Sequence, residues 1–142
     1  MPTMARTLGE CCDAVEECYE FMLAYAAQGL PGDSGSASGS QLRNLLTKAL
    51  DALSTISETY KSTVTEAGLQ PLDKHLAFLP VLESDSRNAS AAIDLVLSQP
   101  VISSQLVDNL NASIHLRALL TDFFVIDEIL KLHQAAAAAS GK

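Results

Sequence analysis

Three cysteines are the most reactive side chains in this sequence, and they lie close together at positions 11, 12 and 18. A nucleophilic thiol needs a lowered pKa, which a nearby cation or a helix N-terminus provides. Cys11, Cys12 and Cys18 instead have acidic neighbours, which disfavour the thiolate. On one helix, Cys11 and Cys18 would be separated by about 10.5 Å of rise, too far for a disulfide. We therefore expect three buried, small hydrophobic side chains, with an intermolecular or regulatory thiol as the alternative.

Carboxylates in the same segment form a second set of chemically capable residues, which we call the acidic face. Its members are Glu10, Asp13, Glu16, Glu17 and Glu20. On a helix they lie opposite the apolar side chains, which predicts a solvated face. Binding of a divalent ion or a basic partner is the alternative. A dimetal helical bundle would need Glu-x-x-His on two helices, and the sequence lacks that spacing.

His115 is the third candidate, because a histidine on a long helix could accept a phosphoryl group. The residues around it lack the Lys-Gly pair that we associate with histidine phosphotransfer proteins. We expect a histidine at the edge of the core or in a helix contact. The glycines at positions 32, 35 and 39 precede no Gly-Lys-Ser/Thr, so no phosphate-binding loop is predicted. We predict no catalytic residue, no metal and no cofactor.

Composition limits the classes of partner and the cellular location. The 142 residues include 17 acidic and 9 basic side chains, a net charge of −8, and the basic residues form no cluster. These features disfavour nucleic acid as a partner. No apolar run approaches the roughly 18 residues of a membrane span, and the N-terminus does not read as a secretory signal. We expect a cytoplasmic protein that does not insert into membranes, with one domain.

Apolar periodicity predicts the helices that position these residues. One helix is expected from Met4 to about residue 28, with an apolar seam that alternates spacings of four and three. The Gly/Ser-rich segment 31–40 is expected to be a flexible surface connection. Ser40 is the expected N-cap of a second helix, which Gly68 and Pro71 end.

The second half of the chain predicts two more helices after an apolar connection. Segment 69–82 is too apolar for a solvated loop, so we expect it to dock on the rest of the protein, with a short helix over 71–78. A third helix is expected over 84–99 and a fourth, the longest, over 101–133. Together they predict an all-α protein, a single antiparallel four-helix bundle over 1–134 with a frayed Ala-rich tail over 135–142.

The predicted fourth helix has two apolar faces. Leu116, Leu119, Leu120, Phe123, Ile126 and Leu130 form the expected core face. Ala118, Val125, Ile129 and Leu132 lie on nearly the opposite side, and we call them the outer face. A helix with two apolar faces is either central in an assembly or carries a contact site.

We therefore expect a non-catalytic interaction module, or a small subunit of a complex, that binds another protein or itself through the outer face. The docked connection 69–82 could instead cover this face within the monomer. Two other functions remain open at this stage: a bundle that holds a small apolar ligand in its core, and an enzyme that uses a divalent metal at the acidic face.

Overall fold

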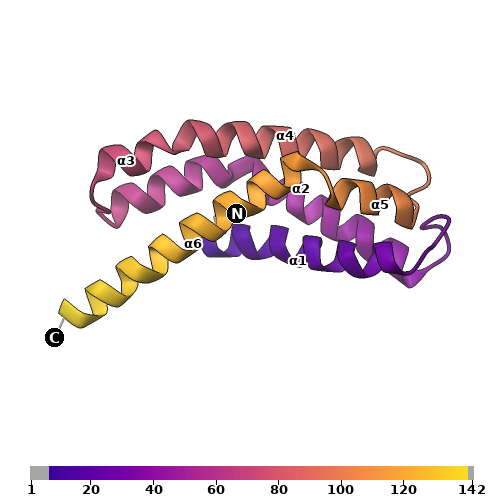
Figure 1. Ribbon diagram of the computed structural model, residues 1–142, viewed down its shortest axis with the longest axis horizontal. Helices are drawn as coiled ribbons and strands as arrows, with labels where there is room; N and C mark the ends of the chain where they lie inside the picture. Colours follow the sequence, from indigo (N-terminus) through magenta and orange to yellow (C-terminus); the bar gives the residue numbers. More distant parts are fainter. Residues whose placement is uncertain (1–6, 141–142) are drawn as a thin grey trace, which may run out of the picture.

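The computed structural model describes residues 7–140, and all regular secondary structure in that range is helical. The helices are α1 (Leu8–Ala27), α2 (Ala37–Glu66), α3 (Leu72–Ala77), α4 (Leu79–Leu97), α5 (Ser104–Asn111) and α6 (Ile114–Ser140) (Figure 1). The all-α prediction is confirmed. No helix within the described range is both long and apolar enough to cross a membrane.

The long helices run alternately in opposite directions along the molecule. α1 packs against α2 on one side and α5 on the other, while α4 packs against α2 and α6 (Figure 1). Thr7 begins α1 with a capping box, because its hydroxyl accepts from the Glu10 N–H and the Glu10 carboxylate accepts from the Thr7 N–H. The seam residue Met4 lies outside the described residues.

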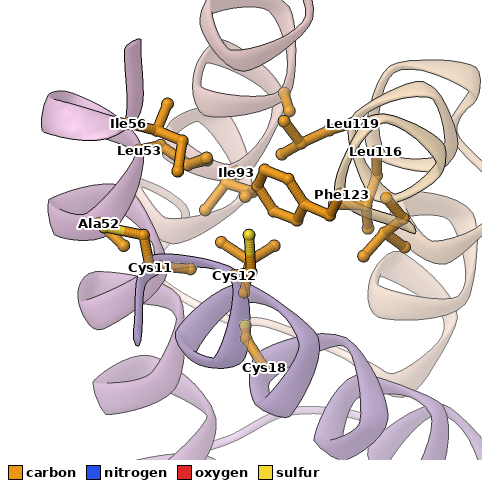
Figure 2. Close-up of a cluster of buried hydrophobic side chains, with 14 of the residues drawn as sticks. Cys11, Cys12, Cys18, Ala52, Leu53, Ile56, Ile93, Leu116, Leu119 and Phe123 are labelled. Atoms are coloured by element: carbon orange, nitrogen blue, oxygen red, sulfur yellow. The ribbon is translucent and has the colours of Figure 1, made fainter. Parts of the chain in front are cut away.

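The core forms where the apolar seams of α1, α2, α4 and α6 meet. Figure 2 shows the Phe123 ring of α6 reaching between Ile93 of α4 and the cysteines of α1. All the residues of the predicted core face of α6 are buried except Leu130, which is half-buried. Cys11, Cys12 and Cys18 are buried here and none is in a disulfide, as predicted.

The connection between α1 and α2 differs from its prediction as a flexible segment. Asp33 is buried, and its carboxylate pairs with Arg43 of α2 and accepts from the Ile102 N–H at 2.7 Å. The Arg43 guanidinium also donates to the carbonyls of Leu97 and Gln99, at 3.1 and 2.9 Å. This polar network fastens the connection to the segment after α4, which composition alone does not indicate.

Because the connection is fastened, α2 begins earlier than predicted. Ser36, not Ser40, is the N-cap, and its hydroxyl accepts from the Gly39 N–H at 2.9 Å. A Cβ atom on Gly39 would lie 1.9 Å from the Asp33 carbonyl oxygen. Glycine is therefore required at this position for the close approach of two backbone segments.

A single fourth helix over 101–133 is wrong, because the segment is divided into α5 and α6. α5 is tied to α1: the Ser104 hydroxyl donates to the Tyr25 carbonyl at 2.6 Å, and the Tyr25 hydroxyl donates to the Ile102 carbonyl at 2.8 Å. α6 packs on α4 instead. The chain changes direction between α5, which packs on α1, and α6, which packs on α4. At the start of α6, the Ser113 hydroxyl accepts from the His115 N–H at 3.2 Å.

The apolar connection 69–82 is mostly helical, whereas only a short helix over 71–78 was predicted within it. It contains α3 and the start of α4, which begins at Leu79 and not near residue 84. Leu69 and Leu82 are buried, and Phe78, between α3 and α4, is half-buried. The tail over 135–139, predicted to be frayed, continues α6 as helix up to Ser140.

Candidate functional site

The outer face of α6 is covered at its beginning and open further along. Ala118 is half-buried, whereas Val125, Ile129 and Leu132 have exposed fractions of 47, 39 and 63%. A face that stays apolar while exposed forgoes about 25 cal/mol for each Å² of apolar surface left in water. The exposed part of the outer face is therefore the candidate docking surface.

An apolar groove of about 270 Å³ lies beside this exposed part. Its α6 wall is formed by Val125, Ile126, Ile129 and Leu130. Its opposite side is formed by the end of α2, the α2–α3 connection, α3 and the residue between α3 and α4. The side chains are those of Tyr60, Val64, Leu69, Pro71, Lys74, His75 and Phe78. The docked connection thus lies opposite the outer face without covering it, and the two leave a hollow between them.

The α3 side of the groove is held in place by Tyr60. Its hydroxyl donates to the His75 carbonyl at 2.8 Å, and its ring meets the Phe78 ring edge-to-face with the centroids 6.2 Å apart. Burial raises the pKa of the Tyr60 hydroxyl above its ordinary value. The wall is therefore preformed, and a ligand or partner would not have to order it.

A buried carboxylic acid lies on α6 where the outer face is covered. Asp122 is buried, and the Asp85 carboxyl of α4 lies within hydrogen-bonding reach. Burial and the neighbouring Asp85 raise the pKa of Asp122 to about 8. Its Oδ2 atom and the hydroxyl of buried Ser86 have no hydrogen-bond partner. Protonated Asp122 can donate to Asp85, so a proton helps to hold α6 on α4.

Most of the acidic face is directed toward solvent. Glu10, Asp13, Glu17 and Glu20 are exposed and Glu16 is half-buried. Burial and the nearby carboxylates of Asp13, Asp127 and Glu20 raise the pKa of Glu16. Among residues 7–140, no three His, Cys, Asp or Glu side chains gather as a metal site requires.

The remaining candidate residues are the cysteines of α1 and His115 of α6. Burial, the largest cause, and nearby acidic residues raise the pKa of both Cys12 and Cys18 to about 12, so neither thiol ionises at neutral pH. His115 is exposed in the first turn of α6, so the expectation that it lies at the edge of the core is wrong.

A second, wider cleft of about 1260 Å³ lies on another side of α6, between α2 and the first turn of α1. Most of the residues that line it are of polar type, among them Thr55, Glu58, Asp127 and Lys131. Lys131 pairs with Asp127 one turn earlier on α6, at 2.9 Å. Exposed ion pairs of this kind contribute little free energy to holding side chains in place. The cleft therefore offers no fixed polar site comparable with the apolar groove.

Sequence reasoning identified the α6 side of the groove but not its opposite side. Val125 and Ile129 belong to the predicted outer face, whereas the contribution of Tyr60, His75 and Phe78 was missed. His75 and Phe78 belong to the apolar connection 69–82, which was predicted to dock, with coverage of the outer face as one alternative, whereas Tyr60 lies before it on α2. Comparison of the chain with protein-family models, curated proteins and solved structures finds no match, so function is inferred from this geometry.

Proposed function

We propose that this protein is a non-catalytic interaction module whose docking surface is the exposed part of the outer face. The observation that carries the proposal is the exposure of Val125, Ile129 and Leu132 beside an apolar groove. In soluble proteins, a continuous apolar surface with a hollow in it is typical of a contact site. α1, α2, α4 and the α5–α6 pair would serve as four antiparallel columns of a bundle that carries this surface.

A helical or extended partner segment suits the surface better than a flat one. Side chains of such a segment could insert between α3 and α6, while its backbone follows the outer face. Binding in this mode relies on a few apolar anchors in a preformed groove. The contact between Tyr60 and His75 supplies that preformed wall.

Site-specific photo-crosslinking tests the proposal. A benzophenone amino acid in place of Leu132 should give discrete adducts in an extract of the cells that produce the protein. The matched control is the same amino acid in place of Leu95, which is 66% exposed on α4 and lies outside the groove. Adducts that Ile129→Glu abolishes support the proposal; equal labelling at both positions, or none at Leu132, overturns it.

A small apolar ligand is the second candidate function, and the groove gives it a specific place. The space between α3 and α6 is lined mainly by apolar side chains, which suits such a ligand, whereas Phe123 fills the predicted core site. Native mass spectrometry of freshly purified protein separates the two functions. A retained small mass that Val125→Trp displaces would favour the ligand, and a clean mass of the chain alone would oppose it.

A further inference from the structure

The groove between α3 and α6 has an apolar floor. Val64, Leu69 and Ile126 line the groove and are buried, so they form its floor. Val125 and Ile129 also line it but are exposed, so they form its rim on α6. Figure 1 shows α6 diverging from α2 toward its C-terminal end, and the two helices do not pack on each other. The floor between them suits an apolar chain or ring.

The charged side chains of the groove are basic, although the chain as a whole is acidic. Lys74 and His75 of α3 line it, and among the described lining residues the only other titratable group is the hydroxyl of Tyr60. The neighbouring carboxylates of Asp73 and Glu128 are not part of the lining. By contrast, four carboxylates line the wider cleft on the other side of α6. The groove therefore presents positive charge on a chain with 17 acidic and 9 basic residues.

Both basic side chains are available to a ligand. Lys74 is exposed and His75 is half-buried. Within residues 7–140, no hydrogen bond or ion pair engages the Lys74 ammonium or the His75 ring, and Tyr60 uses only the His75 carbonyl. Arg43 and Lys131, in contrast, are paired with carboxylates. An unpaired cation at the edge of an apolar groove favours a ligand that carries a negative charge beside its apolar part.

The volume of the groove limits the size of this ligand. At about 270 Å³, it lies just below the range of about 300 to 1,000 Å³ that is typical of pockets for drug-sized molecules. A whole helix is about 10 Å across with its side chains and does not enter such a space. A single apolar chain of medium length does.

We propose that the groove binds a free medium-chain carboxylic acid, with its apolar chain on the floor and its carboxylate beside Lys74 and His75. This inference rests on the small-ligand function proposed above and names the chemical class of the ligand. The carboxylate would lie on the exposed side of α3, where water completes its solvation, so no charge has to be buried. The wall that Tyr60 holds in place lowers the cost of ordering the site.

NMR titration of the ¹⁵N-labelled full chain with two probes of equal chain length, octanoate and octylammonium, tests the sign of the charge. Octanoate should shift the amide signals of Lys74, His75 and Ile129 saturably. It should also bind more tightly than octylammonium, although the net charge of −8 favours the cation. Tighter binding of octylammonium, or the absence of saturable shifts with octanoate, overturns the proposal.

Two variants with the same change of charge test the role of Lys74. Lys74→Gln should weaken octanoate binding about two- to fivefold, as expected for an ion pair at an exposed site. Lys61→Gln is the matched control, because Lys61 is exposed on α2 outside the groove, and it should leave octanoate binding unchanged. Equal affinities of the two variants for octanoate would overturn the assignment of Lys74 to the carboxylate.

Filling the groove distinguishes binding there from binding elsewhere on the surface. Val125→Trp should abolish octanoate binding, because the indole would occupy the space beside the floor. Leu95→Trp, at an exposed position of α4 outside the groove, should bind octanoate like the wild type. The NMR spectrum of each variant also shows whether the fold is retained. Octanoate binding that survives Val125→Trp in a folded chain overturns the proposal.

This inference and the docking function can fail separately. Octanoate binding in the groove without any photo-crosslinked adduct at Leu132 would support the carboxylic acid and overturn the docking function. Adducts at Leu132 from a chain that does not bind octanoate would support the docking function and overturn the carboxylic acid.

Discussion

The side chains of Asp122 on α6 and Asp85 on α4 are two carboxyl groups placed together across a helix interface, and Asp122 is buried. Two charged carboxylates at this distance would repel each other, and burial adds a cost for any charge. Protonation of Asp122 removes both costs and supplies a donor. The docking of α6, and with it the position of the outer face, is therefore linked to pH.

The first prediction concerns the dependence of stability on pH. Asp122 keeps its proton in the folded state up to about pH 8, whereas in the unfolded chain it ionises near about 3.9. Between these values the folded state holds the extra proton, so the free energy of unfolding falls as pH rises. The slope from this one proton is at most about 1.4 kcal/mol per pH unit. Urea unfolding at several pH values between about 5 and 9 measures it.

Asp122→Asn is the matched variant for this measurement. The amide cannot ionise but can still donate to Asp85, so the slope should become shallower. The variant should exceed the wild type in stability by a margin that grows from about pH 4 and levels off above about pH 8. The difference between the two chains isolates Asp122 from the other titrating groups. Identical slopes for the two chains would contradict the assignment.

The second prediction concerns Asp33, which joins three parts of the chain. Arg43, followed by the backbone N–H of Ile102, lowers the pKa of Asp33, while burial opposes the shift. Asp33→Ala would leave the half-buried Arg43 and the Ile102 N–H without this acceptor. We expect this to lower the free energy of unfolding by about 2 to 4 kcal/mol. Ser34→Ala, exposed in the same connection, should change little. Equal urea midpoints for the two variants would show that the network does not stabilise the fold.

The third prediction compares two glycines near helix N-termini. Gly39→Ala would force a Cβ atom against the Asp33 carbonyl. We therefore expect the free energy of unfolding to fall by about 3 kcal/mol, or the chain to fail to fold. Gly9→Ala on α1 meets only Thr7 Oγ1, at 3.9 Å, and should stabilise by about 0.5 kcal/mol through helix propensity. Thermal unfolding by circular dichroism measures both. Similar melting temperatures for the two variants would disprove the close approach.

Periodicity in the sequence was sufficient to predict an all-helical chain and the two faces of α6. Spacing placed Phe123 in the core and Ile129 on the outer face, because a helix turns by a constant angle per residue. The break at Ala112 was not predicted, since apolar spacing continues across it while the supporting helix changes from α1 to α4. Ser113, a favourable residue at a helix start, was the local feature that could have indicated it.

Contacts between distant segments could not be predicted in the same way. The pairing of Asp33 with Ile102, and of Tyr60 with His75, depends on how loops meet after the helices pack. A Gly/Ser-rich composition indicates flexibility on average, but one buried carboxylate with an arginine partner is enough to order such a segment. For the same reason, the α6 side of the groove could be predicted from the sequence, whereas the side formed by α2 and α3 could not.

The last prediction concerns the reactivity of the thiols. With its pKa raised to about 12, Cys12 or Cys18 exposes about 1,000-fold less thiolate than a thiol of ordinary pKa near 9. Burial of all three cysteines also blocks access to the reagent. Iodoacetamide at neutral pH should therefore leave the native protein unmodified and should alkylate all three positions in urea. The exposed thiol of Ala139→Cys is the internal control and should react under native conditions. Rapid alkylation of Cys12 or Cys18 in the folded chain would show that α1 opens far more often than its packing implies.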